Sequence, residues 1–369
     1  MITSKKKILH LITGLEVGGA ETMLLKTLPT TKAAVDHFVC SITGVGPIGD
    51  KLTAGGIPVY HLDLTHALDL TIIPRLRHLI NKINPDVLIT YLPHADILGR
   101  VIGRSAGVPT IVASIRVRLT RSKYLPFFLL DGATSPFIDR YHFNSRTIAD
   151  IHRRLLHISP QKITVIPNAI DVSKYNITVD VEEKREELNI PRGKLVLGCV
   201  ARLRKQKGYP YLVAAFADLH KKRADTVLVV VGDGEEKKRI MHEITRRGLN
   251  EHVLMLGNRH DIAQILQVFD IYVLTTLYEG MSNSIMEAMA AKRAIVTTNI
   301  PENRELISDG KTGLLVPARN APATSQALVK LIDNPDIRDN LARAAYAQVV
   351  ANFNLDVIIP KYRRFYESL

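Results

Sequence analysis

The sequence predicts an α/β fold with two doubly wound domains, and three observations lead to this prediction. The chain has 369 residues, more than a single hydrophobic core usually serves, so two domains of ordinary size are expected. Short apolar runs of strand length alternate with helical patterns in both halves, which is typical of a parallel sheet covered on both faces. A polar, charged segment at 172–194 separates the two alternations and indicates a connector with a surface helix.

The first half alternates apolar strand patterns with amphipathic helix patterns, beginning with a strand. Gly14, Gly18 and Gly19 lie between this strand and the first helix, where doubly wound folds bind phosphate. Their spacing differs from the dinucleotide fingerprint, which disfavours an NAD site and leaves a plain tight turn as an alternative. Strands are predicted over 7–12, 38–43, 59–64, 85–91 and 109–114, and helices over 20–28, 72–83 and 97–106.

The second half repeats the alternation after the connector. Its apolar runs are rich in β-branched residues, and its helical segments are bounded by glycine-containing turns. Strands are predicted over 195–200, 226–231, 253–256, 271–274, 294–297 and 312–316, and helices over 211–221, 235–247, 261–268 and 283–290.

Composition and cysteine usage indicate a globular protein of a reducing compartment. Hydrophobic residues make up 46% of the chain and charged residues 23%, which excludes a disordered chain. Cys40 and Cys199 are too few for a disulfide framework or a cysteine zinc site, and a cytosolic setting is therefore expected. The basic start and the run at 8–15 lack an uninterrupted apolar core and a cleavage site, and no apolar segment reaches the ~18 residues of a spanning helix.

The net charge of +13 is concentrated in the first half and leaves three kinds of anionic partner open. Nucleic acid, an anionic membrane and an anionic substrate would each be attracted by such a charge. A non-catalytic nucleic-acid binder is disfavoured, because aromatic residues are not interleaved with the cations as stacking platforms require. We therefore expect no nucleic acid among the partners.

The segment 270–291 carries the strongest functional signal. A buried strand pattern passes through Glu279 and Gly280 into a helix pattern that contains Glu287. Unpaired N–H groups and the helix dipole at such a junction suit phosphate, while the carboxylates suit sugar hydroxyls. Two alternatives stay open: Ser284 and Glu287 could form a capping box, and Glu279 could be a solvated loop acid.

Two further loops follow predicted strands of the second half, at the edge where ligands of open α/β sheets bind. The loop at 201–208 contains Arg202 and Lys207, which can hold phosphate groups, although a solvated basic loop is an equal alternative. Asn258 and Arg259 follow the strand at 253–256 and could contact a nucleobase through their backbone.

In the first half, His94 and Asp96 follow the fourth strand and are candidates for an acceptor-side base or for hydroxyl ligands. Simple capping duties at the helix start are the alternative. The segment from Arg116 to Leu130 combines cations with an apolar cluster, as at the interface of an anionic bilayer. The alternative is an ordinary core with a solvated cationic rim.

Together these motifs resemble the retaining glycosyltransferases of family 4. The similarity covers nearly the whole chain, and the motifs occur in the family's order. They are Gly18-Gly19-Ala20-Glu21, the segment from Ile166 to Asp171, Arg202 with Lys207-Gly208, and the segment from Tyr278 to Ala290. The resemblance implies two Rossmann-like domains that face each other across a cleft, the GT-B architecture.

The resemblance also implies domain roles. Residues 1–172 would bind the acceptor, residues 173–351 would bind the nucleotide sugar, and a closing helix at about 352–369 would return to the first domain. Glu279 would hold hydroxyls of the donor sugar and Glu287 the ribose, while Arg202 and Lys207 would bind the diphosphate. Backbone N–H groups near Gly19 and at Met281, Ser282, Asn283 and Ser284 would complete the diphosphate site.

The expected reaction is transfer of a sugar from a nucleotide diphosphate sugar, with UDP as the expected nucleotide, to a hydroxyl of a lipid-linked glycan acceptor. We expect no cofactor and no metal, since an Asp-x-Asp motif is absent. No residue is an evident nucleophile, which favours front-face attack with retention. A non-hydrolysing sugar-nucleotide epimerase shares the two-domain plan and is the alternative enzyme.

One departure from the family concerns the residue after the fifth strand. Many members have a histidine there that contacts the donor sugar, whereas this chain has Ser114-Ile115-Arg116. The expected location is the cytoplasm or the inner face of the cytoplasmic membrane.

Overall fold

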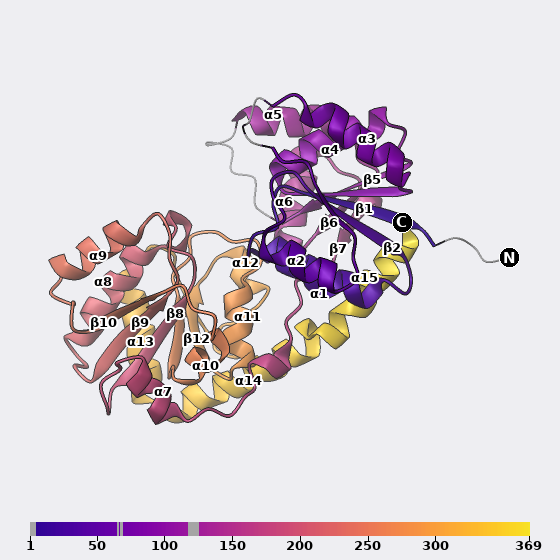
Figure 1. The fold of residues 1–369 in the computed structure, drawn as a ribbon. Helices are drawn as coiled ribbons and strands as arrows, with labels where there is room; N and C mark the ends of the chain where they lie inside the picture. The colour runs from indigo at the N-terminus through magenta and orange to yellow at the C-terminus, as the bar shows by residue number, and fades with distance from the viewer. Residues whose placement is uncertain (1–4, 65, 67–68, 117–124) are drawn as a thin grey trace. The chain divides into compact units, whose positions relative to one another are not determined.

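The computed structural model describes residues 5–64, 66, 69–116 and 125–369, and side chains are described except at 125–128. The chain divides into two compact units (Figure 1). The first consists of Met1–Ala169 with Leu355–Leu369, and the second of Ile170–Asn354. The C-terminal helix therefore belongs to the first unit.

The first unit contains a seven-stranded sheet of order β3-β2-β1-β4-β5-β6-β7, in which all pairs are parallel. The strand order reverses between β1 and β4, so the carboxyl ends of these two strands flank the switch point of a doubly wound sheet. The strands are β1 (Lys7–Ile12), β2 (Asp36–Ser41), β3 (Val59–His61), β4 (Val87–Tyr91), β5 (Thr110–Ile115), β6 (Arg140–Phe143) and β7 (Ile163–Val165).

Helices cover both faces of this sheet (Figure 1). Along β1, Ile8 and Ile12 join one apolar cluster, while Leu9 and Leu11 join another, as the alternation of side chains in a strand requires. The helices are α1 (Gly19–Thr31), α2 (Gly46–Ala54), α3 (Ile72–Ile83), α4 (Pro93–Ser105), α5 (Leu125–Thr134), α6 (Arg146–Leu156) and α15 (Leu355–Ser368), with 3₁₀ turns η1 (Ser135–Phe137) and η2 (Pro160–Lys162).

The second unit has a six-stranded parallel sheet of order β10-β9-β8-β11-β12-β13, whose switch point lies between β8 and β11. Its strands are β8 (Leu195–Val200), β9 (Thr226–Val231), β10 (Val253–Gly257), β11 (Ile271–Leu274), β12 (Ala294–Thr298) and β13 (Leu314–Val316). Its helices are α7 (Val181–Glu187), α8 (Tyr209–His220), α9 (Lys237–Arg246), α10 (Ile262–Gln267), α11 (Asn283–Ala290), α12 (Pro301–Arg304), α13 (Ala321–Asp333) and α14 (Pro335–Phe353), with 3₁₀ turns η3 (Val172–Lys174) and η4 (Lys205–Lys207).

The predicted fold class is confirmed, because each unit is a doubly wound parallel sheet. Several predicted bounds coincide with the observed ones, including those of β1, α3, β8, β9, β11 and α11. The prediction of a strand over 59–64 is wrong beyond His61, since Asp63 has a φ of 49°, which no strand accommodates. The prediction that the last strand starts at 312 is also wrong, because Thr312 closes a turn onto Ser308.

The sequence interpretation missed the strands β6 and β7 and the helices α2, α5, α6, α12, α13 and α14. β6 reads Arg140-Tyr141-His142-Phe143 and lacks the continuous apolar run by which a buried strand is recognised, while β7 has three residues. In the part of the chain that the structure describes, no helix combines the length and the apolarity needed to cross a membrane.

Candidate functional site

The junction between β11 and α11 lies at the carboxyl end of its sheet, beside the switch point. Ser282 is the N-cap of α11, and its hydroxyl accepts a hydrogen bond from the N–H of Ile285 at 3.4 Å. Ser284 already lies inside the helix, so the alternative in which Ser284 caps it and Glu287 completes a capping box is wrong.

Glu279 is buried in the loop before this helix and is held by three side chains. Its Oε1 accepts from Thr276 Oγ1 at 2.9 Å and pairs with Lys207 Nζ. Its Oε2 accepts from Gln206 Nε2 at 3.2 Å. With 6% of its surface exposed, Glu279 is not a solvated loop acid, so that alternative is also wrong.

The loop after β8 is bound to the loop after β11 by backbone contacts as well. Leu277 donates its N–H to Gln206 O at 2.8 Å, and Thr275 Oγ1 donates to Gly208 O at 3.1 Å. Gly208 has a φ of +66°, and a Cβ there would lie 2.2 Å from Thr275 O. Only glycine allows this approach, which brings the Lys207 side chain to Glu279.

The turn after β9 supports the loop that carries Arg202. Gly232 has a φ of +133°, and a Cβ there would lie 2.1 Å from Ala201 O. Leu203 donates its N–H to Asp233 O at 2.9 Å. The Arg202 side chain is exposed at this sheet edge. Gly232 and Gly234 thus form a tight turn after β9.

Tyr272, on β11, lies beside three of the predicted ligand residues. Burial raises the pKa of Tyr272 well above its usual value, and the charges of Glu287 and Glu279 add to that rise, whereas a hydrogen bond with Ser284 opposes it. Glu287 also forms a side-chain hydrogen bond with Tyr175, whose pKa is raised by burial first and by Glu287 second. Both carboxylates of the predicted site are therefore close to Tyr272 of β11.

Asn258 and Arg259 follow β10, one strand position farther from the switch point than β9. Asn258 is exposed, while the Arg259 guanidinium pairs with Glu187 at 2.8 Å and Asp261 at 2.7 Å. The Arg259 side chain is therefore engaged in ion pairs. A contact between the Arg259 backbone and a nucleobase stays a prediction. Within the described residues, none of the hydrogen bonds of the Arg259 side chain involves Glu279 or Lys207.

In the first unit, His94 and Asp96 lie in the first turn of α4 but face differently. His94 is exposed. Asp96 is buried, accepts from Thr90 Oγ1 at 2.5 Å and lies 3.7 Å from Arg100 Nη2, while burial raises its pKa to about 6. Asp96 is thus a member of an internal network. The capping alternative is wrong for it, because α4 has no side-chain cap.

The glycine pair lies at the start of α1, directly beyond the carboxyl end of β1. Gly18 is the N-cap in an extended conformation, and its carbonyl accepts from Thr22 N at 3.0 Å. A Cβ on Gly18 would lie 2.3 Å from a Glu21 carboxylate oxygen. The pair therefore begins a helix of 13 residues, as expected for a helix start at a doubly wound switch point.

Part of the basic and apolar segment lies outside the described residues, namely 117–124 and the side chains of 125–128. The two described ends of the segment differ in exposure to solvent. Arg116 is buried, whereas Leu129 and Leu130 on α5 are 63% and 48% exposed. An ordinary core is therefore the wrong interpretation for these two leucines.

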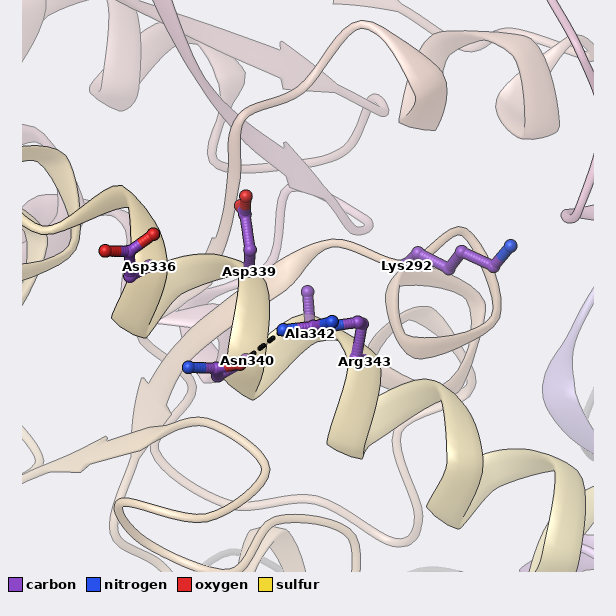
Figure 2. Close-up of a pocket in the computed structure, with 6 residues that line it drawn as sticks. All are labelled: Lys292, Asp336, Asp339, Asn340, Ala342 and Arg343. Carbon is purple, nitrogen blue, oxygen red and sulfur yellow. Dashed lines mark hydrogen bonds between the residues drawn. The ribbon is translucent and has the colours of Figure 1, made fainter.

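The second unit also has a cavity of about 660 Å³ that involves none of the predicted site residues. Its lining includes Lys292, after the C-terminal end of α11, and Asp339 and Arg343 of α14, all labelled in Figure 2. The predicted phosphate ligands lie at the opposite, N-terminal end of α11. Among the described residues, no cluster of three or more His, Cys, Asp or Glu side chains could hold a metal ion.

Sequence reasoning missed three residues that hold the two carboxylates: Gln206, Thr276 and Tyr175. Gln206 and Thr276 were open to prediction, because each lies in a predicted ligand loop, Gln206 beside Lys207 and Thr276 three residues before Glu279. Tyr175 was not, since it directly follows η3 and reaches Glu287 only through the tertiary fold.

Two family models match the chain. "Glycosyltransferase Family 4" matches residues 17–174 and "Glycosyl transferases group 1" matches residues 180–348. Two doubly wound units with this site define a glycosyltransferase of the GT-B architecture. The chain belongs to glycosyltransferase family 4, which confirms the resemblance read from its motifs.

One similar relative matches over nearly the full length, and another over about half of it. The UDP-Gal:alpha-D-GlcNAc-diphosphoundecaprenol alpha-1,3-galactosyltransferase of Escherichia coli is 26% identical, with 98% of this chain and 97% of the relative covered. An N-acetylgalactosaminyltransferase of Campylobacter jejuni that acts on N-acetylgalactosamine-N,N'-diacetylbacillosaminyl-diphospho-undecaprenol is 30% identical over 49% of this chain and 47% of its own length.

Among solved structures, Anabaena HepE in complex with UDP and glucose superimposes with a TM-score of 0.89 at 21% identity and covers 99% of this chain and 100% of HepE. At this identity the likeness shows the fold. The lipopolysaccharide outer core galactosyltransferase WaaB matches with a TM-score of 0.76 at 17% identity, covering 98% of this chain and 100% of WaaB.

Proposed function

We propose that this glycosyltransferase moves a sugar from a UDP-sugar to a hydroxyl of a lipid-linked glycan, with retention at the anomeric carbon and without a metal. One observation carries the proposal: Lys207 and Glu279 meet at the N-terminal end of α11, beside the switch point of the second sheet. This places a cation, a buried acid and helix N–H groups within one cluster, which suits a sugar attached to a diphosphate.

We assign donor binding to the second unit. Arg202, Lys207 and the backbone N–H groups at residues 281–284 hold the diphosphate, and Glu279 accepts hydrogen bonds from sugar hydroxyls. Glu287 accepts from the ribose in the same way, in exchange for or beside its bond with Tyr175. The backbone at Asn258 and Arg259 contacts the base. The nucleotide is proposed as UDP because HepE was solved with UDP.

The chemistry follows from charge. As the bond between the anomeric carbon and the diphosphate oxygen breaks, negative charge grows on the leaving group and the sugar becomes oxocarbenium-like. Arg202, Lys207 and the α11 N-terminus stabilise that negative charge, which is electrostatic catalysis. The acceptor hydroxyl then bonds to the anomeric carbon on the same face, and its proton passes to the leaving diphosphate oxygen.

Glu279 does not serve as the attacking nucleophile in this proposal. Each of its oxygens already accepts a hydrogen bond, and one is paired with the Lys207 ammonium. A carboxylate whose oxygens are so engaged is a weak nucleophile, but it remains a good hydrogen-bond acceptor. Front-face attack therefore accounts for retention better than a covalent intermediate does.

The acceptor is assigned to the first unit and to the lipid-linked class. The Escherichia coli and Campylobacter jejuni relatives both act on sugars attached to diphosphoundecaprenol. Gly18 and Gly19 supply further N–H groups for the diphosphate, and exposed His94 is proposed as a ligand of the acceptor hydroxyls. Leu129 and Leu130 are exposed on α5, as an approach to an anionic membrane surface would require.

A thermal-shift screen tests the donor assignment. UDP and UDP-sugars at 100 times their dissociation constant should stabilise the protein by about 2.7 kcal/mol, whereas GDP- and ADP-sugars should have little effect. Products are then analysed with and without a polyprenyl diphosphate-linked sugar. Transfer only in the presence of the acceptor supports the proposal, and sugar epimerisation without acceptor contradicts it.

A further inference from the structure

Arg116, directly after β5, is buried among neutral partners in the first unit. Nη1 donates to Asn168 Oδ1 at 2.8 Å and Nη2 donates to the Tyr362 hydroxyl at 3.2 Å. The guanidinium carbon lies 5.9 Å from the centre of the Tyr91 ring. Only 9% of the residue is exposed, so the charge is largely removed from water.

The other buried cations of the described chain have carboxylate partners. Arg100 contacts Asp131 at 2.5 Å and Asp96 at 3.7 Å. Lys184 contacts Glu187 at 2.7 Å and Asp261, the N-cap of α10, at 2.6 Å. Arg116 contacts no carboxylate among the described residues, and the residues outside the described ranges include no Asp or Glu.

Arg116 also retains an unused donor. Its Nε is buried and has no hydrogen-bond partner in the part of the chain that the structure describes. A buried charge without an opposite charge is costly, and a donor without an acceptor adds to that cost. Hydrogen bonds to an amide and a phenol, with a nearby ring face, offset only part of it.

The position of Arg116 suits a ligand rather than a structural ion pair. It follows β5 at the carboxyl edge of the first sheet, next to β4, whose end flanks the switch point. Asn168, from the loop after β7, and Tyr362, from α15, fix the two terminal nitrogens. The planar fork is thereby held in one orientation, as recognition of an oxyanion requires.

We propose that Arg116 binds an oxyanion of a substrate, separate from the donor diphosphate held by the second unit, and that this anion supplies the missing opposite charge. The chemistry fits a phosphate of a lipid diphosphate acceptor or a carboxylate on a transferred or accepting sugar. The inference rests on the proposed function for the identity of the substrates.

Kinetics of Arg116→Gln and Arg116→Lys test the inference. The expected result is a rise of roughly 10- to 100-fold in KM for the substrate that carries the anion. The value of kcat should change less, because the lost interaction is made in the bound substrate as well as in the transition state. Arg116→Lys keeps the charge but not the fork and should fall between wild type and Arg116→Gln. Arg140→Gln is the matched control, since it removes a cation from the amino end of the neighbouring β6.

A comparison of charged and neutral substrates identifies the source of the anion. If it is the acceptor phosphate, wild type and Arg116→Gln should have equal KM values for the same sugar attached to a neutral alkyl chain. If it is a sugar carboxylate, the selective loss should appear with hexuronic acid substrates and be absent with the corresponding hexoses. Equal losses with charged and neutral substrates, or no loss with any, would overturn the inference.

A binding measurement separates this inference from the proposed function. Inorganic pyrophosphate, added to protein saturated with UDP, should raise Tm further in wild type and in Arg140→Gln but not in Arg116→Gln. A protein that UDP stabilises but that shows no Arg116-dependent pyrophosphate effect refutes the anion site alone. A protein that ignores UDP but keeps the Arg116-dependent effect refutes the UDP assignment alone. If Arg116→Gln does not fold, Tyr362→Phe replaces it in this measurement. This variant keeps the guanidinium but removes one of its hydrogen-bond acceptors, and it should weaken the pyrophosphate effect.

Discussion

Lys207 and Glu279 form an ion pair although 72 residues separate them in the chain. Lys207 lies after β8 and Glu279 after β11, and these strands are neighbours at the switch point of the sheet. The fold thus brings together a cation and an acid that serve different parts of one proposed ligand, the diphosphate and the sugar. The pair also orients the buried acid before any ligand arrives.

Replacement of Lys207 by Met should affect both stability and activity. Glu279 would remain buried without its opposite charge, which should lower the free energy of unfolding by about 2 kcal/mol. Loss of a diphosphate ligand should also lower kcat by roughly 100-fold. Urea unfolding and steady-state kinetics measure the two effects. Lys205→Met, an exposed neighbour, is the control, and equal behaviour of the two variants would contradict the assigned role.

Replacement of Gly208 by Ala should disrupt the contact between the two ligand loops. The new Cβ would lie 2.2 Å from Thr275 O in addition to facing a φ of +66°. Gly248→Ala is a matched control in the same unit, because its φ is +68° and nothing lies within 4 Å of the added Cβ. The control should lose about 1 kcal/mol of unfolding free energy, and Gly208→Ala about 3 kcal/mol or more. Similar losses in urea unfolding would show that the close approach is unimportant.

Acid should destabilise the first unit through its buried histidines. Burial lowers the pKa of His37 to about 4, and burial, followed by the His37 charge, lowers the pKa of His10 well below its usual value. Such groups are neutral when folded and bind protons on unfolding. Their stabilising contribution is therefore complete above about pH 6.5 and declines by about 1.4 kcal/mol per pH unit per histidine as the pH falls toward the folded pKa.

The comparison of wild type with His37→Gln isolates this effect. Asp96 acts in the opposite direction over part of the window, since burial raises its pKa to about 6, but it is common to both proteins. The stability difference between wild type and variant should shrink as the pH falls from 6.5 to 4. A difference that stays constant between these pH values in urea unfolding would refute the assigned protonation state.

Binding to vesicles should depend on the exposed leucines of α5. Replacement of Leu129 and Leu130 by Ser should reduce co-sedimentation with phosphatidylglycerol vesicles at low salt, because apolar area is lost from the proposed membrane contact. Met241→Ser, which removes a 50% exposed apolar residue of the second unit, is the control. Equal sedimentation of all three proteins would exclude α5 as the contact.

Local signals in the sequence were sufficient to predict the elements that form the donor site. The ends of β11 and α11 follow from an apolar run and a serine-rich helix start, both of which act within a few residues. The pairing of Lys207 with Glu279 did not follow, because it depends on the order of strands in the sheet rather than on spacing along the chain.

The direction in which individual side chains point could not be predicted from the sequence either. Asp96 and His94 occupy the same helical turn, yet one is buried against Thr90 and the other is exposed. The isolation of Arg116 from carboxylates is likewise a property of the packed unit, since acids occur throughout the sequence. The missed strand β6 carries Arg140 and His142, whose polarity conceals its buried position.

The central claim is that Glu279 orients the donor sugar while the neighbouring cations hold the diphosphate. Calorimetric titration of UDP and single-turnover kinetics on Glu279→Gln test it most directly. The account predicts a UDP dissociation constant within about threefold of wild type and a turnover rate at least about 100-fold lower, because the sugar is lost as a bound group but the diphosphate is not. Unchanged turnover in this variant would contradict the account.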